Sequence, residues 1–364
     1  MMRKEYVDRL IRMMPEAGFD AVLIQPGEEL QFLFGASPMM CERFQGMVIK
    51  ADGKMFYFCN LLYEGQMREY LPDDIAIYTW FDNDDMTDVV SRIFKEQGLE
   101  GATVGVNASA QAFNVLDLAD AMNIRFRSAK ALIEEIRIHK TPEEMQALRD
   151  SAAITDRVFT EILPKIHPGV TEAELQDFLL TRMAELGGRS PECIVGIGAN
   201  ASYPHYIDNK GVAGDRDIVL MDYGCTYNGL YSDMTRTVFI GEPEERIREA
   251  YDLVLRANLA AEAMVKPGAW IPDLDRKARE VLDEKGYAHT LINRLGHGVG
   301  YTIHEQPEIK QSDRRKLEPG MAFSIEPGIY MTGDFGIRIE DVVMVNDKGE
   351  CEVLNHSDKN MIVL

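Results

Sequence analysis

The sequence has no unbroken apolar run of about 18 residues, the length that a membrane-spanning helix needs. The N-terminal stretch Met1 to Asp8 also lacks the apolar segment of a signal peptide. Cysteine is sparse, since the five residues are widely spaced and none forms a C-x-x-C pair. These absences favour a cytoplasmic protein with reduced thiols over a membrane protein or a disulfide-framed secreted one.

Basic residues are also scarce relative to acidic ones. Lys and Arg together number 39 against 60 for Asp and Glu, which gives a net charge of −21. A chain this acidic repels phosphate backbones, and no Lys/Arg-rich run offers a local exception. We therefore exclude nucleic acid, and also membrane, as partners.

What is present is the composition of a folded globular protein. Apolar residues make up 46% and charged residues 27% of the chain. At roughly 150 residues per domain, 364 residues predict two domains, with three as the alternative. A chain of this length can bury a sizeable core.

The first third of the chain alternates helix and strand signals. Apolar residues recur at helical spacing over 6–14, and Gly18 follows as a stop signal. Short apolar runs predict strands, a Gly-containing turn predicts a hairpin, and a further helical stretch follows. These segments are the strands 21–24 and 103–106, the hairpin strands 46–50 and 54–58, and the helix 86–97. We expect a small α/β domain over residues 1–138.

A second domain, over residues 139–364, is expected to begin with a long helix. Thr141 to Glu144 form a capping box with Pro142 at the first helical position, and Thr171 to Glu174 form a second capping box. Further helices are expected over 244–265 and 273–285, between strand-rich stretches at 217–240 and 320–345. Helices and hairpins in this arrangement predict an α+β fold.

The first strand-rich stretch carries two carboxylates that we expect on one face of a hairpin. Asn228-Gly229 is typical of a two-residue type I′ turn. With that turn, Asp222 lies opposite Thr235 and Asp233 is its diagonal neighbour. From this hairpin alone, two solvated aspartates near a turn remain an equal alternative.

The second strand-rich stretch repeats the pattern. A three-residue loop at 332–334 would place Glu326 directly opposite Glu340, within otherwise apolar strands. Like charges facing each other in a sheet are destabilising unless something neutralises them. A bound cation would do so.

Between the two hairpins, His297 is flanked by glycines, which let the backbone approach another group closely. A lone histidine of this kind is usually structural, but here it accompanies four carboxylates. This oxygen-rich set suits Mn²⁺, Co²⁺ or Zn²⁺ better than a thiolate zinc site. Five protein ligands exceed what one catalytic metal normally uses, so two metal ions that share bridging carboxylates fit better.

These residues resemble the "pita-bread" metallopeptidases, and within them the Xaa-Pro peptidases, prolidase and aminopeptidase P. The small leading domain is similar to the creatinase-like N-terminal domain of that group. The resemblance covers nearly the whole chain. It rests on Asp222-x10-Asp233, the string 232–237, the glycine-rich segment 296–300, His304-Glu305, Glu326-Pro327-Gly328 and the string 338–341.

The resemblance implies a dinuclear metal site with a hydroxide held between the ions. Asp222 would hold one metal, His297 and Glu326 the other, and Asp233 and Glu340 would bridge them. Glu326 would also act as general base and proton shuttle. Of the candidate metals we expect Mn²⁺, with Co²⁺ or Zn²⁺ as alternatives.

The resemblance also implies roles for residues around the metals. His304 would steady the tetrahedral intermediate, and His205 would bind substrate. Arg338 and Thr235 would orient the bridging carboxylates, and Tyr330 would border the pocket. Each of these residues also has an alternative without a role in function. His304 and His205 would be surface histidines, Arg338 would form a structural ion pair, and Tyr330 would lie in the core.

One position departs from many relatives, which carry a histidine four residues before the metal-binding histidine. This chain has Asn293 there. An amide donates and accepts hydrogen bonds but carries no charge near neutral pH. The departure therefore bears on substrate preference and rate, and leaves the expected metal site intact.

The expected function is metal-dependent hydrolysis of the bond between an N-terminal residue and proline in short peptides. We expect an Xaa-Pro dipeptidase, with aminopeptidase P acting on longer peptides as the alternative. A metal-free creatinase-like hydrolase or a non-catalytic binding relative fits less well, because all five ligands are present. Family resemblance also implies a homodimer.

Overall fold

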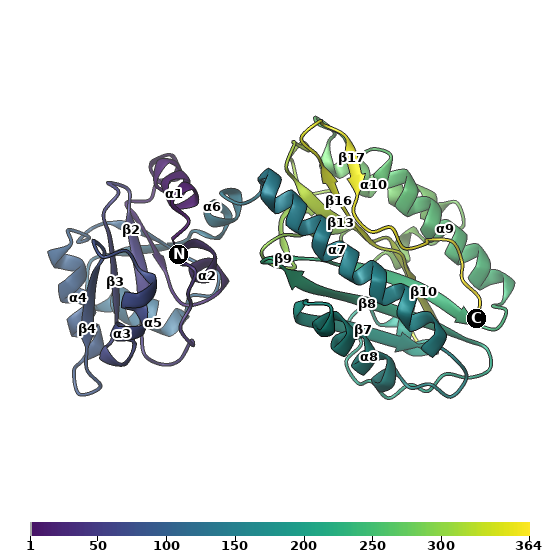
Figure 1. Ribbon diagram of the computed structural model, residues 1–364. Helices are drawn as coiled ribbons and strands as arrows, with labels where there is room; N and C mark the ends of the chain where they lie inside the picture. The colour runs from purple at the N-terminus through teal and green to yellow at the C-terminus, as the bar shows by residue number, and fades with distance from the viewer. Residues whose placement is uncertain (1) are drawn as a thin grey trace. The chain divides into compact units, whose positions relative to one another are not determined.

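The computed structural model describes residues 2–364. The chain divides into two compact units, Met1–Arg137 and Ile138–Leu364, which Figure 1 shows in purple to blue and in teal to yellow. None of the helices in the described part of the chain is both long and apolar enough to cross a membrane.

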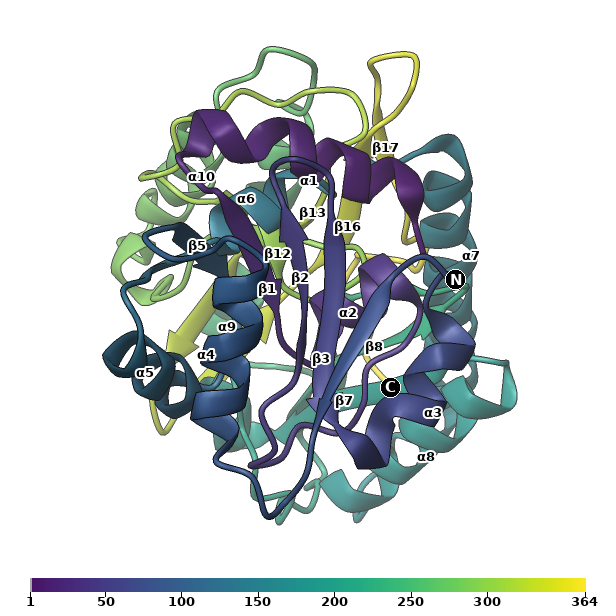
Figure 2. The same cartoon turned by 90° about the vertical axis from the view of Figure 1, so that its left-hand side faces the viewer.

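The N-terminal unit is built around a six-stranded mixed sheet with the order β4-β3-β2-β1-β5-β6. Figure 2 looks onto this unit, with β2 and β3 side by side. Its elements are α1 (Lys4–Ala17), β1 (Ala21–Ile24), α2 (Glu28–Phe34), β2 (Gly46–Lys50), β3 (Met55–Asn60), α3 (Leu61–Tyr70), β4 (Ala76–Trp80), α4 (Met86–Glu96), β5 (Thr103–Val106), α5 (Ala112–Ala121), β6 (Arg125–Ser128) and α6 (Lys130–Glu135).

Local sequence explains the main elements of this unit. The apolar stripe of α1, which includes Leu10 and Met14, is buried, and Gly18 ends the helix in a left-handed conformation with φ of 73°. All four residues of β1 are buried, as its continuous apolar run predicts for a central strand. The expected helices, strands and hairpin of this region are present.

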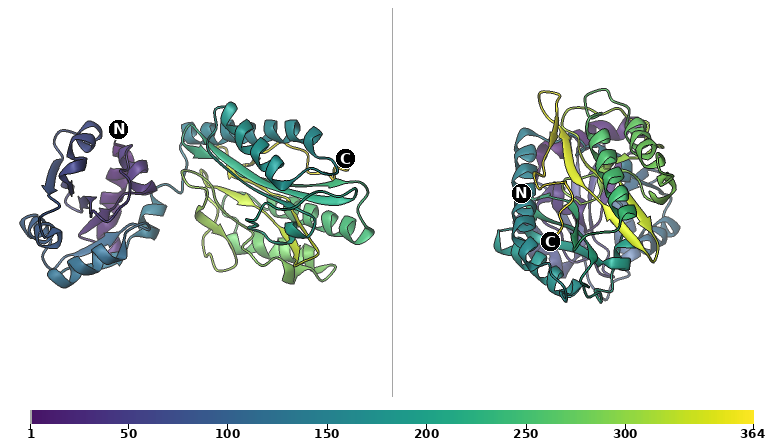
Figure 3. Two further views of the ribbon diagram at one scale, coloured as in Figure 1. Left: turned by 90° about the horizontal axis from the view of Figure 1, so that it is seen from below. Right: turned by 90° about the vertical axis from the view of Figure 1, so that its right-hand side faces the viewer.

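The C-terminal unit places its sheets between two layers of helices. One sheet has the order β10-β8-β7, the other β12-β11-β13-β16-β17, and β14 pairs with β15. The left panel of Figure 3 shows the teal helices and the green helices on opposite sides of the strands. Accordingly, α7 and α8 contact β8 and β7, whereas α9 and α10 contact β13 and β12.

The longer elements of this unit begin with the two helices that the capping boxes predict, α7 (Pro142–Ile162) and α8 (Glu172–Glu185). The others are β7 (Arg189–Ile197), β8 (Asp217–Tyr227), β9 (Leu230–Tyr231), β10 (Met234–Ile240), α9 (Glu245–Glu262), α10 (Ile271–Asp283), β11 (Gly296–Gly298), β12 (Glu305–Ile309), β13 (Ala322–Ile325), β14 (Gly328–Met331), β15 (Phe335–Arg338), β16 (Asp341–Val345) and β17 (Cys351–Val353). Short 3-10 turns cover Leu163–Lys165, Gly198–Ser202 and Ala288–Thr290.

The first hairpin has the predicted register. Asn228 and Gly229 both have positive φ, as a type I′ turn requires, and Tyr227 pairs with Leu230. Further along the ladder, Thr235 pairs with Asp222. The backbone is tightest at Gly224, where a Cβ atom would lie 2.1 Å from the carbonyl oxygen of Ser232.

The second hairpin differs from the expected continuous ladder. Its loop is the predicted one, because β14 and β15 pair from Met331–Phe335 to Gly328–Arg338. Pairing then stops and resumes in another sheet, where Ile325 pairs with Asp341. Glu326 and Glu340 stand in the gap between these two pairings. They are therefore not a paired cross-strand couple, which corrects the expected arrangement.

The hydrogen-bonding groups at this gap are used elsewhere. The Glu326 amide donates to the carbonyl of Leu295 at 2.8 Å, and the Glu340 amide donates to that of Thr235 at 3.1 Å. Pro327 has no N–H to continue the ladder. These hydrogen bonds therefore attach the Glu326 segment to the segment before His297. They attach the Glu340 segment to the first hairpin.

A buried ion pair connects the start of this unit to the same region. Lys140, just before α7, donates to Glu305 at 2.5 Å, and both side chains are almost completely buried. Gly300 makes room for the pair, because a Cβ atom there would lie 2.2 Å from the Glu305 carboxylate. Glu305 directly follows His304, so the pair fixes the segment that carries this histidine.

Candidate active site

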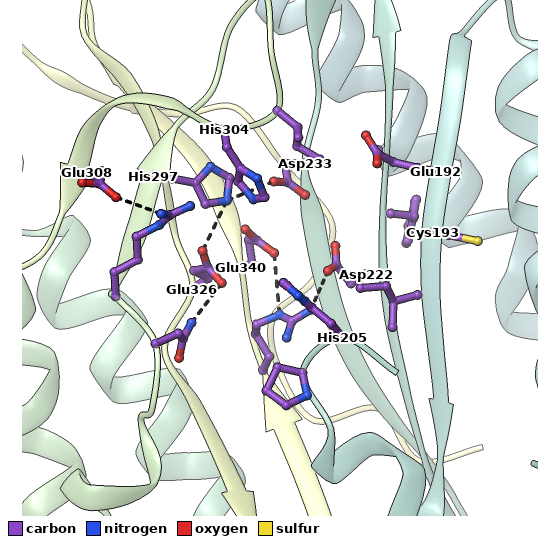
Figure 4. Close-up of a pocket in the computed structure, with 18 of the residues that line it drawn as sticks. Glu192, Cys193, His205, Asp222, Asp233, His297, His304, Glu308, Glu326 and Glu340 are labelled. Carbon is purple, nitrogen blue, oxygen red and sulfur yellow. Dashed lines mark hydrogen bonds and ion pairs between the residues drawn. The ribbon is translucent and has the colours of Figure 1, made fainter. Parts of the chain in front are cut away.

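A cavity of about 780 Å³ opens between the two larger sheets of the C-terminal unit. Its wall contains nine of the residues singled out above: His205, Asp222, Asp233, Asn293, His297, His304, Glu326, Arg338 and Glu340. Figure 4 shows the four carboxylates and His297 pointing toward one another from strands and from the short segments that join them. Thr235 and Tyr330 are not part of this wall.

Arg338 fixes the positions of two of the carboxylates through hydrogen bonds. Its guanidinium is 3% exposed and donates to the Asp222 carboxylate at 2.6 Å and to the Tyr330 hydroxyl at 2.8 Å. Its Nε donates to Thr235 Oγ1 at 2.8 Å, and that hydroxyl donates to Glu340 Oε2 at 2.6 Å. Asp222 and Glu340 are therefore held in fixed orientations by a connected network.

His297 lies at the centre of the remaining ligands. Its Nε2 is 3.3 Å from a Glu326 oxygen and 3.6 Å from an Asp233 oxygen. One ligand atom from each of Asp233, His297 and Glu340 can be chosen so that all three lie within 4.8 Å of one another. The structure thus brings all five sequence-predicted metal ligands into one cavity.

The pKa values of these side chains differ strongly from their usual values. Burial, followed by the charges of the neighbouring carboxylates, raises the pKa of Asp233 and of Glu340 well above the usual range. Burial also raises the pKa of Glu326 to about 7. For His297, burial lowers the pKa well below its usual value, which leaves a neutral imidazole, the form that binds metals.

The donor set fits two divalent cations. Four carboxylates converge, and Arg338, the one guanidinium buried among them in the described chain, cannot neutralise them all. Buried carboxylates that lack a counter-ion must take up protons, which is what their raised pKa values indicate. Divalent ions bound by these oxygen and imidazole ligands would neutralise the carboxylates.

Two histidines and an amide complete the wall. The ring of His304 lies 4.2 Å from that of His297, centroid to centroid, in an edge-on arrangement. His205 is exposed on the loop after the 3-10 turn at 198–202, within the same cavity. The side-chain amide of Asn293 donates to Glu326 at 3.3 Å, and the backbone carbonyl of Asn293 accepts a bond from Arg279 at 2.8 Å.

The cavity also contains charged residues that the sequence analysis did not single out. These are Glu192, Arg294, Glu308 and Lys310. Arg294 donates to Glu308 at 3.0 Å, and Lys310 contacts the same carboxylate. The only sequence signal for them was the alternation of Glu308 and Lys310 with apolar residues, which places two charges on the strand face that carries His297.

Tyr330 lies deeper than expected. Its side chain is buried, burial raises its pKa to about 12, and its hydroxyl meets Arg338 rather than the cavity. It therefore supports the arginine that holds Asp222.

Comparison with known proteins identifies the family of both units. Residues 146–347 match metallopeptidase family M24, and residues 7–139 match the Creatinase/Prolidase N-terminal domain. Together these matches confirm the expected fold, a creatinase-like α/β domain followed by an α+β metallopeptidase domain.

Individual relatives align over almost the whole chain. The probable dipeptidase PepE of Mycobacterium bovis is 35% identical over 354 residues, which cover 96% of this chain and 93% of that protein. The Xaa-Pro dipeptidase of Pyrococcus furiosus is 32% identical, with 95% and 96% covered. The crystal structure of a recombinant prolidase from Thermococcus sibiricus superimposes with a TM-score of 0.93 at 29% identity, over 100% of both chains.

Proposed function

Because this chain belongs to metallopeptidase family M24, we propose that it is an Xaa-Pro dipeptidase, which hydrolyses the bond between an N-terminal residue and proline. The observation that carries the proposal is the convergence of Asp222, Asp233, His297, Glu326 and Glu340 in one cavity. Full-length similarity to proteins named Xaa-Pro dipeptidase and prolidase supports the substrate class. We assign residues 1–138 to the N-terminal domain and 139–364 to the catalytic domain.

We propose that the cavity holds two divalent metal ions. Asp222 would hold one, His297 and Glu326 would hold the other, and Asp233 and Glu340 would be shared by both. Mn²⁺ is our first choice because carboxylate oxygens dominate the ligand set, and Co²⁺ and Zn²⁺ are the alternatives. When bound, such ions polarise the scissile carbonyl and lower the pKa of water.

Glu326 is the group placed to move the proton. It contacts His297 on one side and the Asn293 amide on the other, so its carboxylate is oriented toward the ligand cluster. We assign it the role of general base, which takes the proton of the attacking water. The nitrogen of a peptide bond to proline has no hydrogen and must gain a proton to leave, so the same carboxyl group returns it.

His304 and His205 act on the substrate. The imidazole of His304 lies against His297 and faces the cavity, where it donates a hydrogen bond to the oxygen that becomes negative as the carbonyl is attacked. His205 stands on a loop at the cavity wall and binds the peptide. Arg338 and Thr235 keep Asp222 and Glu340 in place throughout.

We further propose a homodimer that works in the cytoplasm. The symmetric dimer is the commonest assembly among soluble oligomers. The five cysteines are all free, as expected in a reducing compartment.

Chelation followed by metal addition tests the function. The stripped protein should be inactive, and Mn²⁺, Co²⁺ or Zn²⁺ should restore cleavage of Leu-Pro but not of the control Leu-Ala. Leu-Pro-Ala assayed in parallel separates the two specific activities, because preferred cleavage of the tripeptide indicates aminopeptidase P. A protein that binds no stoichiometric metal, or that cleaves neither proline peptide when loaded, contradicts the proposal.

A further inference from the structure

A buried carboxylate connects helix α8 to the loop that carries His205. Glu172 is the first residue of α8 and is completely buried. One oxygen of its carboxylate accepts hydrogen bonds from the backbone N–H of Ile197 and from the side-chain amide of Asn200, both at 2.8 Å. The other oxygen accepts a bond from the backbone N–H of Gly211 at 2.6 Å. All three donors lie outside α8.

Capping of the helix does not account for this side chain. An acidic residue in the first turn usually bonds the free N–H groups of its own helix. In α8 that task falls to Thr171 and Glu174, which form the capping box. Burial of a carboxylate costs free energy unless its oxygens are hydrogen-bonded, and for Glu172 the three bonds from outside the helix meet that need.

The three donors stand at the two ends of one loop. Ile197 ends β7, Asn200 lies in the 3-10 turn that follows, and Gly211 comes directly after residues 203–210, which we call the His205 loop. The backbone N–H of Glu172 also donates to the carbonyl of Gly211, at 3.0 Å. Glu172 therefore bonds both ends of the His205 loop.

The far end of the loop is packed directly against the carboxylate. A Cβ atom at Gly211 would lie 2.4 Å from an oxygen of Glu172, which is closer than such atoms approach. At Gly214, by contrast, a Cβ atom would lie at an ordinary contact distance of 3.6 Å from Asp217. A side chain at position 211 would therefore displace the carboxylate, whereas one at position 214 would not.

The near end of the loop is attached to the second carboxylate-bearing hairpin. The hydroxyl of Ser202 accepts a hydrogen bond from the backbone N–H of Gly333 at 3.0 Å. Gly336, on β15, lies so close to Ala201 that a Cβ atom would be 1.8 Å from its carbonyl oxygen. Because β15 ends at Arg338, which holds the carboxylate cluster, this end of the loop has a fixed place beside the proposed metal ligands.

His205 stands between the two held ends. It is exposed, so its place in the cavity wall depends on the course of the loop rather than on packing around its ring. On the basis of the proposed peptidase function, we infer that Glu172 is a positioning residue, which holds the His205 loop so that His205 meets the substrate. Glu172 is not part of the cavity wall and acts through the loop.

A double-mutant cycle tests whether Glu172 acts through His205. We would measure kcat and KM for Leu-Pro with the metal-loaded wild type, Glu172→Gln, His205→Ala and the double variant. The Gln side chain keeps one oxygen for the near end of the loop but turns N–H groups toward the N–H of Gly211, which releases the far end. The matched control is Glu185→Gln, at the exposed last residue of α8.

We expect Glu172→Gln to raise KM about tenfold and to leave kcat and metal content close to those of the wild type, because a hydrogen bond to a carboxylate is lost away from the metal ligands. His205→Ala should raise KM at least as much. The double variant should equal His205→Ala, because a residue that acts through another has no effect once that residue is removed. Glu185→Gln should behave as the wild type.

A second variant disturbs the same contact from the loop side. Gly211→Ala should raise KM as Glu172→Gln does, and Gly214→Ala should not, so the inference can be tested even if Glu172→Gln fails to fold. Additive effects of Glu172→Gln and His205→Ala on KM overturn the inference. Loss of metal or of kcat in Glu172→Gln, with KM unchanged, also overturns it.

Limited proteolysis examines the loop without turnover. Lys210 is the one trypsin site within residues 190–215, and it is exposed. Cleavage after Lys210 should be about tenfold faster in Glu172→Gln, because a larger fraction of molecules has an open loop, and unchanged in Glu185→Gln. An unchanged rate in Glu172→Gln overturns the inference. A wild type that cleaves no proline peptide contradicts the peptidase proposal instead, and the trypsin rates then still decide whether Glu172 holds the loop.

Discussion

The two carboxylate-bearing hairpins of the C-terminal unit are built differently. In the first, β8 and β10 pair residue by residue from Asp217–Ile240 to Tyr223–Met234. In the second, the ladder has the same register on both sides of an interruption, and Glu326 and Glu340 occupy that interruption. The first hairpin has an uninterrupted ladder of paired residues. In the second, the pairing is interrupted at the two carboxylates.

The difference shows how the protein avoids a direct clash of charges. A continuous second ladder would fix Glu326 and Glu340 side by side, where like charges repel. Instead, the backbone of Glu326 bonds to Leu295 and that of Glu340 bonds to Thr235. Under the proposed function, the first hairpin would hold two of the metal ligands, whereas the second would hold two ligands and also carry the general base.

The largest effect is expected when Glu340→Gln is compared with Asp222→Asn. This comparison tests the distinction between a proposed bridging ligand and a proposed terminal ligand. Loss of the proposed bridging ligand should release both metal ions and bring turnover to background, while Asp222→Asn should release one ion. Metal content measured by plasma mass spectrometry distinguishes these results. Equal loss from the two variants would remove the distinction between bridging and terminal ligands.

Glu326→Gln should be the next largest effect. The amide keeps the shape of the side chain but cannot accept the proton, so turnover should fall by about a thousandfold. Circular dichroism should remain that of the wild type. Glu350→Gln, in the β16–β17 turn away from the cavity, is the matched control. Substantial residual turnover in Glu326→Gln would reject the assignment of the general base.

His304→Ala should have a smaller effect, confined to chemistry. Removal of one hydrogen-bond donor to the developing negative charge should lower kcat roughly a hundredfold. Metal content should stay at the wild-type value, because this ring is not a proposed ligand. His289→Ala, exposed on the 3-10 turn at 288–290, should leave both quantities unchanged. Metal loss in His304→Ala would move this histidine into the ligand set.

The smallest expected effect is a change in the stability of the metal-free protein with pH. The folded chain raises the pKa of Glu326 from 4.5 to about 7, so it holds this proton more tightly than the unfolded chain does. The stability of the metal-free protein should therefore fall as the pH rises from about 4.5 to about 7. Metal-loaded protein should show little of this decline, since the cations keep the carboxylates ionised. Parallel melting curves across this pH range provide the check, and identical slopes for both forms would contradict it.

Local sequence signals predicted the parts of the fold that depend on neighbouring residues. Both capping boxes are present, with Thr141 and Thr171 accepting bonds from the third residue of their helices. The Asn228-Gly229 turn sets the register that places Asp222 opposite Thr235. These features involve residues a few positions apart, which is why a pattern can reveal them.

The interruption of the second hairpin was not predictable in this way. It depends on the contact between Glu340 and Thr235, which are 105 positions apart. Three charged residues of the cavity wall, Arg294, Glu308 and Lys310, were missed for a related reason. Glu308 and Lys310 alternate with apolar residues as solvent-facing charges do, and only the folded chain shows that they and Arg294 line a cavity.

The buried pair of Lys140 and Glu305 determines where the chain can be cut for separate production of its C-terminal unit. A fragment that begins at Ile138 retains the lysine. One that begins at Thr141, the first residue of the capping box, removes the cation that faces a deeply buried carboxylate. Such a loss costs several kcal/mol, and Glu305 adjoins His304. The shorter fragment should therefore express poorly or lose activity through its histidine loop, although every proposed metal ligand would still be encoded.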